Sequence, residues 1–558
     1  MSLNRRDFLK GALVTGAVAA ATALPGCAAP TSSAATTTKS SSDGIGKHTW
    51  EVPPAPITDI AETKNYDIVI VGAGIAGLSA AEAAARNGAT VAVIERTESH
   101  QLRGGDVGCI GSKWQLDHGT NIDPLNAARQ LHTWSQQTTN YNLIRTWATR
   151  SGKVFDHIEE IGEAQGMHMA PALSPTSKLG WDVMPEHWQV HNTSTALFRG
   201  DEVDGYSRPD GKPRNWNIGD ALLTAAENDG AEFIYNTHAE QLVGDAASGI
   251  TGVIAKDKND KNIQFNAAKG VILATGDIGG NQEMIDVFCP IANRADSNLY
   301  NPVGGNTGDG ILMGVWAGAS LSKSPAAHMI HQFGFDTLSF SINSFSMCWL
   351  AINRNGERYG FEMPVEPYLT NARMNTPGNI AWSLFDADYP TYVQSQWPES
   401  YEDILKGADE ELQKRVKEGT AFRADTIEDL AKQLSVPAEQ LKATIERFNT
   451  LYTKGVDEDF GLPATHLSQI KTPPFYAAPN ICNVLTIPYG LHVDDNSQVC
   501  TSDDDPIDGL YAVGNVQGDF FGVSYPVLYP GISHGRCVTF GQLVGEALAK
   551  DTTLTKTA

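Results

Sequence analysis

The stretch with the clearest chemical meaning is GAGIAG, in which Gly72, Gly74 and Gly77 follow an apolar run. In such a pattern the first glycine permits a tight turn, the second lets the backbone approach a pyrophosphate, and the third lets helix pack on strand. Phosphate groups then bind at the helix N-terminus. Glu95 ends the next apolar run, TVAVIE, and its carboxylate is suited to a ribose hydroxyl. The spacing therefore predicts a dinucleotide site.

The elements that must position this site can be predicted from the residues around it. Residues 67–71, which are apolar after Asp67, predict a buried strand, and residues 75–87 are alanine-rich and end at Gly88, which predicts a helix. The run that finishes at Glu95 predicts the second strand. Strand, helix, strand and acid in this order indicate a Rossmann-like unit.

Four further glycine-rich stretches follow in order: RGGDVGCIG (103–111), GVILATGDIGGN (270–281), NTGDGILMGVWAGA (306–319) and GLYAVGN (509–515). Together with GAGIAG they resemble the fumarate reductase/succinate dehydrogenase flavoprotein family, of the FAD-dependent oxidoreductase 2 type. The resemblance covers roughly residues 63 to 550. It implies an α/β fold with a Rossmann-like FAD-binding domain, residues 63–326 and 484–550, and an inserted α+β capping domain for the substrate, residues 327–483.

The resemblance also implies which residues hold the cofactor. FAD would bind at Gly72, Gly74, Ala76, Gly77, Glu95, Gly105, Asp106, Gly111, Ala239, Asp309, Asn515 and Ser533. The family usually has Glu or Asp where this chain has Asn515, and an amide can still bond a ribityl hydroxyl. No histidine clearly stands at the position used for covalent attachment, so non-covalent FAD is expected.

The family's residues for a small dicarboxylate are missing here. The place of its acid-donating arginine holds Glu366, and the places of its other charged or histidine residues hold Ile342, Phe345, Leu485, Thr486 and Leu528. We therefore expect a substrate larger and less charged than fumarate, with an aromatic and apolar lining formed by Phe345, Trp349, Tyr489, Tyr525, Leu528 and Tyr529.

The stretch SYPVLYPGISHGR (524–536) holds the main catalytic candidate. Its Tyr-Pro-Gly is similar to one in flavin-dependent ketosteroid dehydrogenases, which implies that Tyr529 donates to a substrate carbonyl, assisted by N–H groups around Ile532 and Ser533. Tyr525 either shapes the site or is core, and His534 and Arg536 either contact the flavin or cap the last helix. For the proton donor the candidates, in descending order, are His331, Tyr489 and Arg373.

The N-terminus predicts export. NRRDFLK (4–10) is a twin-arginine pattern, residues 11–24 are apolar and uncharged, and LPGC resembles a lipobox that would place a lipid on Cys27. We therefore expect a signal over residues 1–27 and a linker over 28–62, with the protein at the outer face of the cytoplasmic membrane or in the periplasm. The net charge of −24 makes nucleic acid an unfavourable partner. The absence of CxxC and CxxCH excludes covalent c-type haem, and no metal site is predicted.

These features predict an exported ene-reductase that uses an unsaturated organic compound as electron acceptor in anaerobic respiration. A separate membrane donor, linked to a cytochrome or a quinol, would supply its electrons. Two alternatives stay open: a dehydrogenase that introduces a C=C bond on the same scaffold, and a flavin electron carrier without chemistry of its own.

Overall fold

The computed structural model describes residues 48–171, 191, 193–199, 217–298, 305–331, 347–362, 368–398 and 401–554. The predicted signal with Cys27 and residues 28–47 of the predicted linker lie outside these ranges, as do Ile342, Phe345 and Glu366. Within them, no helix combines the length and the hydrophobicity needed to cross a membrane.

The predicted dinucleotide unit belongs to an eight-stranded sheet with the order β17-β18-β9-β1-β2-β6, to which β8 and β7 are joined through β9. Pairing is parallel from β18 to β6. The strands are β1 (Ile60–Val71), β2 (Val91–Ile94), β6 (Glu232–Ile234), β7 (His238–Asp245), β8 (Gly249–Lys256), β9 (Asn262–Leu273), β17 (Gln498–Cys500) and β18 (Pro506–Ala512). Residues 68–71 are buried throughout, as is typical of a central parallel strand.

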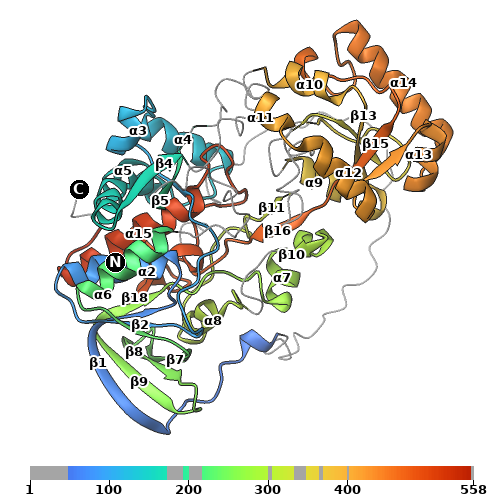
Figure 1. The fold of residues 1–558 in the computed structure, drawn as a ribbon. Coiled ribbons are helices and arrows are strands. Elements are labelled where there is room, and N and C mark those ends of the chain that lie inside the picture. Colours follow the sequence, from blue (N-terminus) through green and yellow to red (C-terminus); the bar gives the residue numbers. More distant parts are fainter. Residues whose placement is uncertain are drawn as a thin grey trace, which may run out of the picture. The chain divides into compact units, whose positions relative to one another are not determined.

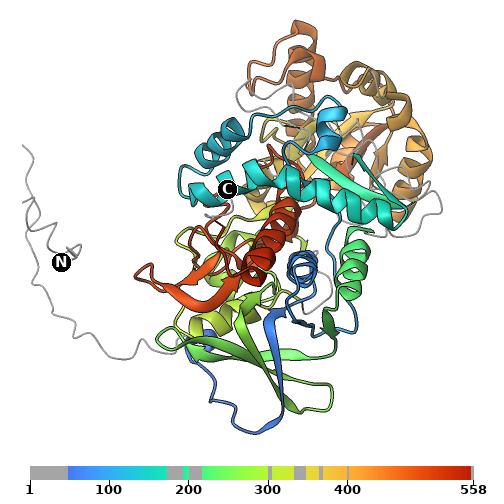
Figure 2. The ribbon, with the colours of Figure 1, turned by 90° about the vertical axis from the view of Figure 1, so that its left-hand side faces the viewer.

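Helix α2 (Ile75–Arg86) follows β1 directly, one residue shorter than predicted. It packs between α6 (Asn217–Asn228) and α15 (Ile532–Ala549), and Figures 1 and 2 both show this row of helices beside the sheet. The other helical elements that flank the sheet region are η1 (Thr49–Glu51), α3 (Lys113–Asp117), α4 (Pro124–Trp134), α5 (Tyr141–Ala164), α7 (Gln282–Phe288), η5 (Pro290–Arg294), α8 (Asp309–Trp316) and η8 (Gly514–Val516).

Two small sheets accompany the large one. The first has the order β3-β5-β4 and the second the order β10-β16-β11. Their strands are β3 (Val107–Gly108), β4 (Met167–Pro171), β5 (Ser194–Arg199), β10 (Ser297–Asn298), β11 (Met329–His331) and β16 (Asn483–Thr486). The second sheet joins the two ends of the predicted capping region, because β11 lies at the start of residues 327–483 and β16 begins at their last residue.

The predicted capping region contains its own antiparallel sheet, in the order β12-β13-β15-β14. The strands are β12 (Leu350–Asn353), β13 (Ala381–Asp386), β14 (Phe422–Ala424) and β15 (Phe475–Pro479). The helical elements around it are α9 (Tyr368–Met374), η6 (Pro377–Asn379), α10 (Tyr389–Gln396), α11 (Tyr401–Leu405), α12 (Ala408–Glu418), α13 (Ile427–Leu434), α14 (Ala438–Lys454) and η7 (Ala464–His466).

Helices cover both faces of this antiparallel sheet. Neighbouring residues of its strands therefore pack in two different apolar cores. Leu384 and Ala477 pack in the core that contains α13 and α14, whereas Phe385 and Tyr476 pack in the core that contains α10 and α12. This alternation follows from the two-residue period of a strand. The inserted region is therefore an α+β unit with apolar cores of its own.

A buried ion network stabilises the capping region. Arg358 bonds Glu362 at 2.7 Å and Asp457 at 2.8 Å, and its guanidinium lies over the rings of Phe448 and Phe460. Burial alone would raise the pKa of Asp457, but the bonds from Arg358 lower it to about 2. Arg358 therefore compensates two buried carboxylates.

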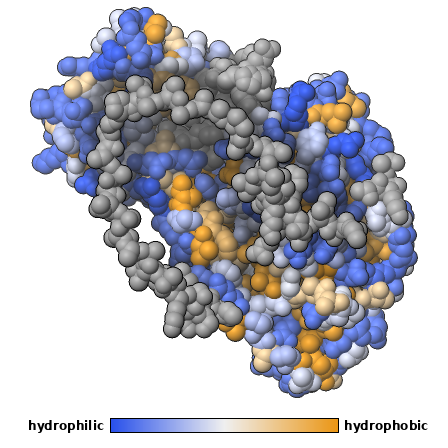
Figure 3. Space-filling view, turned by 180° about the vertical axis from the view of Figure 1, so that it is seen from behind, coloured by the Kyte–Doolittle hydropathy of each residue, from blue (hydrophilic) through white to orange (hydrophobic). Residues whose placement is uncertain are grey.

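The surface on the side opposite to the view of Figure 1 is mostly hydrophilic, and its apolar side chains form separate patches (Figure 3).

Candidate functional site

The turn between β1 and α2 and the first turn of α2 contain three glycines, and each position has glycine for a different physical reason. Gly72 has a φ of +103°, and a Cβ there would lie 2.7 Å from the carbonyl oxygen of Ala274. A Cβ on Gly77 would overlap the carbonyl oxygen of Gly72. At Gly74, in contrast, a Cβ would meet only the carbonyl oxygen of Gln101, at 3.7 Å. The protein itself therefore does not require glycine at 74, which leaves close approach of a ligand as the reason for it.

Glu95 lies at the end of β2 and reaches back to this turn. Its Oε2 accepts a hydrogen bond from the backbone N–H of Ala73 at 2.8 Å, and its Oε1 accepts from the N–H of Thr97 at 2.9 Å. The carboxylate is buried but keeps lone pairs for a further donor. The predicted ribose-binding position is thus held next to Gly74, and Ala76, the second residue of α2, is buried.

Asp309 begins α8 and bonds two cationic side chains close to the same strand end. Its Oδ2 lies 3.0 Å from His238 Nε2 and 3.2 Å from Arg96 Nη1. The bond from Asp309 raises the pKa of His238, which favours the imidazolium form. Ala239, the predicted contact that follows His238, is buried in β7. Arg96 and His238 were not predicted from the sequence, although Arg96 follows directly after Glu95.

The loop around Gly105 and Asp106 packs against the first turn of α15. His534 Nδ1 lies 2.9 Å from the carbonyl oxygen of Asp106, and a Cβ on Gly108 would lie 2.6 Å from the carbonyl oxygen of Pro530. Gly105 is buried in this contact, whereas Gly111, with φ of +78°, is exposed just before α3. The structure therefore brings residues 105 and 106 to α15 and leaves Gly111 at the surface.

Asn515 is the centre of a polar network that joins four segments of the chain. Its Nδ2 donates to Asp277 Oδ2 at 2.9 Å and to Thr486 Oγ1 at 3.1 Å. Its Oδ1 accepts from Arg536 Nη2 at 2.6 Å and from Ser533 Oγ at 3.5 Å. Asn515 and Ser533 are half-buried, whereas Asp277 and Arg536 behind them are fully buried. Arg536 does not cap α15, because its other partner is the carbonyl of Gln517 at 3.1 Å.

Several features of this region fit FAD. Gly74 leaves the backbone open at a helix N-terminus, which suits a pyrophosphate. Two buried polar atoms, Thr275 Oγ1 and Arg536 Nε, have no hydrogen-bond partner within the described ranges. Buried polar atoms are normally satisfied, so these two are exceptions in the region of the candidate site.

Tyr529 lies in the interior of the structure. Its hydroxyl donates to Gln130 Oε1 on α4 at 2.6 Å, its ring stacks on His191 with centroids 4.9 Å apart, and its exposed fraction is 0%. Burial raises its pKa, so the phenol keeps its proton. The N–H of Ile532, predicted to assist Tyr529, is already donated to the carbonyl of Tyr529 at 3.1 Å.

The three proton-donor candidates have different environments. Burial lowers the pKa of His331 to about 3, so this imidazole is neutral at physiological pH. Arg373 forms an ion pair with Asp296 at 2.8 Å. Burial raises the pKa of Tyr489 to about 12, its ring stacks on Phe288, and no described residue hydrogen-bonds its hydroxyl. These observations favour Tyr489 over the other two.

The predicted aromatic lining is not a single surface. Trp349 is 1% exposed and packs on Phe385, with centroids 5.1 Å apart, inside a capping-region core. The prediction that Trp349 lines a substrate site is therefore wrong, because its side chain is needed for that core. Tyr525 stacks on Phe521 at 4.9 Å, and it and Leu528 belong to the core that contains the large sheet.

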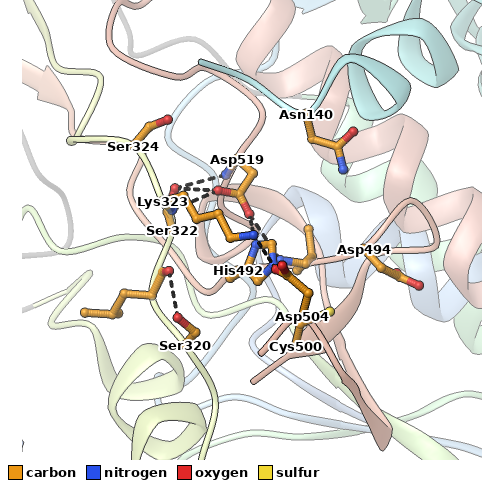
Figure 4. Close-up of polar contacts among 12 residues, drawn as sticks. Asn140, Ser320, Ser322, Lys323, Ser324, His492, Asp494, Cys500, Asp504 and Asp519 are labelled. Carbon is orange, nitrogen blue, oxygen red and sulfur yellow. Dashed lines mark hydrogen bonds and ion pairs between the residues drawn. The ribbon is translucent and has the colours of Figure 1, made fainter. Parts of the chain in front are cut away.

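A histidine between two carboxylates, absent from the predictions, lies behind the segment that carries Asn515. His492 Nδ1 lies 2.5 Å from Asp519 Oδ2, and Nε2 lies 2.7 Å from Asp504 Oδ1, which also pairs with Lys323 (Figure 4). Asp519 in turn accepts from Ser322 Oγ at 2.9 Å. The bond from Asp519 raises the pKa of His492. The cluster ties the end of the 515–519 segment to the β17–β18 hairpin.

Comparison with known families assigns most of the described residues to one family. The model of the FAD binding domain family matches residues 67–527. The model of the twin-arginine translocation signal matches residues 2–24. The first match contains the turn at Gly74, Asn515 and the inserted capping region, and it ends before Ser533 and Arg536.

Individual relatives are distant but cover most of the chain. The probable fumarate reductase Ifc3 of Shewanella frigidimarina is 25% identical over 534 residues, covering 90% of this chain and 82% of that protein. The digoxin reductase of Eggerthella lenta is 27% identical over 568 residues and covers 93% of each chain. The structure of a 3-ketosteroid-delta4-(5alpha)-dehydrogenase from Rhodococcus jostii RHA1 shares the fold, with a TM-score of 0.68, 21% identity, and coverage of 89% of this chain and all of the other.

The two glycines of the turn should respond differently to substitution. Gly74→Ala should leave the melting temperature of the cofactor-free protein nearly unchanged, because its Cβ meets only one atom, at 3.7 Å. It should weaken FAD binding at least tenfold by occupying the space of the pyrophosphate. Gly77→Ala should instead destabilise the cofactor-free protein, since its Cβ overlaps backbone. Flavin fluorescence titration and thermal melting measure both effects, and unchanged FAD affinity in Gly74→Ala would contradict the assignment.

The His492 cluster should make stability depend on pH. The pKa of His492 is raised on folding, so its contribution is complete below the unfolded value of about 6.5 and is lost as pH rises through the folded value. His492→Asn should therefore cost about 1–3 kcal/mol near pH 6 and progressively less at higher pH. Urea unfolding of both proteins from pH 6 to 9 measures the difference, and a difference that grows with pH would refute the role.

Proposed function

The chain belongs to the FAD binding domain family, and we propose that it is an exported FAD-dependent reductase of a conjugated C=C bond in an organic electron acceptor. We further propose that this acceptor is larger or more aromatic than fumarate. The twin-arginine signal indicates export. The protein is an FAD-dependent oxidoreductase, and the proposal concerns its substrate and its partners.

The substrate proposal rests on the surroundings of Thr486 and Leu528. The resemblance places groups that bind a small dicarboxylate at these two positions. Thr486, at one of the histidine places, is committed to the Asn515 network through bonds to Asp277 and Asn515. Leu528, at the place of the carboxylate-binding arginine, is 0% exposed and apolar. Neither position can attract a carboxylate, so an acceptor with two carboxylates would lose its main electrostatic attraction.

The names of the relatives support this class of substrate without choosing one member. A digoxin reductase and a probable fumarate reductase cover most of the chain at similar identity. A bulky acceptor is consistent with the similarity to a digoxin reductase. The missing cations argue against fumarate as the acceptor of this chain. A dehydrogenase that introduces a C=C bond is the alternative, since a ketosteroid dehydrogenase shares the fold. A flavin carrier without chemistry of its own is less favoured.

When bound, FAD would supply the hydride for reduction of the double bond. The chain would contribute a hydrogen-bond donor for the conjugated oxygen of the acceptor and a proton for the neighbouring carbon. We propose Tyr529 as the donor, because its phenol keeps its proton and a substrate oxygen could replace Gln130 as its acceptor. We propose Tyr489 as the source of the proton, because its hydroxyl has no partner among the described residues. Arg373 and His331 would then be structural.

Two partners belong to the same proposal. A lipid on Cys27 would hold the exported protein at the membrane, and a cytochrome-linked or quinol-linked membrane protein would deliver electrons, because the sequence has no haem motif. Loss of lipid labelling in Cys27→Ala would support the anchor, and a mature wild-type protein of unmodified mass would exclude it.

A panel of electron acceptors tests the proposed function directly. The FAD-loaded protein is reduced with a low-potential dye and mixed with enones, cinnamates, lactones and fumarate while flavin absorbance is followed. We expect fast reoxidation by at least one bulky acceptor and slow reoxidation by fumarate. Fumarate turnover equal to that of the best acceptor would refute the substrate proposal. Oxidation of a saturated analogue without reduction of any acceptor would favour the dehydrogenase.

Tyr529→Phe tests the donor with the acceptor that this panel identifies. The ring and its stacking on His191 are retained, so FAD content should be nearly unchanged. Loss of one donor at the site of developing charge should slow reoxidation about 100-fold. Tyr525→Phe is the matched control from the same stretch and should change the rate far less. Wild-type reoxidation in the Tyr529 variant would show that its hydroxyl serves only the contact with Gln130.

A further inference from the structure

Arg536 is a fully buried cation that forms no ion pair with a carboxylate of the described residues. Its exposed fraction is 0%, its Nη groups donate to the oxygens of Gln517 and Asn515, and its guanidinium lies 4.7 Å from the ring centroid of Phe521. Its Nε is buried without a partner. Its hydrogen-bond partners are neutral, and the buried carboxylate of Asp277 attracts it through space without forming an ion pair. Burial of a cation without a directly bonded carboxylate is costly.

Asn515 lies between this cation and the carboxylate of Asp277 and bonds both. Its amide accepts from Arg536 on one side and donates to the buried Asp277 on the other, which only a group with both an acceptor and a donor can do. A Glu or Asp at 515, the usual residue in the family that the chain resembles, would neutralise Arg536 and oppose Asp277. The amide instead separates the two charges.

The packing of α2 on α15 gives the place of Arg536 relative to the cofactor turn. A Cβ on Gly541 would lie 2.6 Å from the carbonyl oxygen of Ala76, and Gly545 approaches Ala80 in the same way, so the helices run parallel in this register. With a rise of about 1.5 Å per residue, Arg536 lies about 6 Å beyond the start of α2, on the side away from that helix. A cofactor with its pyrophosphate at that start can therefore extend alongside Arg536.

We infer that Arg536 stabilises the negative charge that FAD gains on reduction and thereby raises the midpoint potential of the bound cofactor. Two electrons and one proton added to the neutral flavin ring leave one net negative charge, which a nearby buried cation favours. The oxidised ring is neutral and gains much less. Arg536 would thus act on the flavin electrostatically, without taking part in the chemical step. This inference deepens the proposed function and rests on it only for the direction of electron flow.

Midpoint potentials of Arg536→Gln, Arg536→Lys and the wild type, measured at equilibrium with redox dyes from pH 6 to 9, test the inference. We expect Arg536→Gln to lower the ratio of the affinity for reduced FAD to the affinity for oxidised FAD at least tenfold. For a two-electron couple this lowers the midpoint potential by about 30 mV. In Arg536→Gln, the pH above which two-electron reduction of FAD takes up one proton instead of two should also rise. Arg536→Lys should retain much of the wild-type potential, because it keeps the charge.

Arg86→Gln is the matched control, since Arg86 also bonds α15, through Gln542, but is paired with Glu82 at 2.9 Å. Its potential should equal that of the wild type. Asn515→Asp, which leaves Arg536 in place and adds a carboxylate beside it, should also lower the potential. This variant tests the inference even where Arg536→Gln fails to fold.

An unchanged potential in Asn515→Asp or in a folded Arg536→Gln would overturn the inference. Equal losses of affinity for oxidised and reduced FAD would also overturn it, because they would assign Arg536 to the pyrophosphate or to the fold. These measurements contain dye, FAD and protein but no organic acceptor. Their failure is therefore independent of the acceptor panel that tests the proposed function.

Discussion

The close approach of the α2 and α15 backbones is the constraint on which the site depends. Gly541 and Gly545 allow carbonyl groups of α2 to come within distances that any side chain would block. Ser79 Oγ donates to the carbonyl of Val538 at 2.8 Å, and Gln542 returns a bond to the carbonyl of Ser79 at 3.0 Å. Because the helices are parallel, their N-termini point toward the same end of the sheet. Both helix dipoles therefore favour negative charge in the region where the cofactor turn lies.

The sequence predicted the part of the site that is local in the chain. Gly72, Gly74, Gly77 and Glu95 lie within one strand, helix and strand, and their roles follow from spacing alone. The strand β1 begins at Ile60, before the predicted apolar run, because its first half is stabilised by backbone pairing with β9. The side chains there are mostly polar or exposed. Hydrophobic periodicity carries no signal for such a strand extension.

Burial and pairing across distant segments could not be read from the sequence. Asn515 was recognised as a departure, but its partners Asp277, Thr486 and Arg536 come from three other segments. His331 was the first candidate for the proton donor because of its place in the chain. Desolvation makes it neutral, and a linear pattern does not report desolvation.

The distribution of cations distinguishes this chain from the dicarboxylate reductases that it resembles. The resemblance places Leu485, Thr486 and Leu528 at the positions of those enzymes' substrate groups, whereas Arg536 is buried behind Asn515 and Ser533. With fewer protein charges at those positions, an uncharged acceptor would gain little ground-state attraction from the enzyme. The barrier to its reduction must then be lowered largely by hydrogen-bond donors aimed at the developing charge. A buried cation that raises the potential of FAD would favour reduction of the cofactor by its electron donor, at the expense of driving force for the later transfer to the acceptor. Because it is buried, it would do so without attracting anionic molecules to the site.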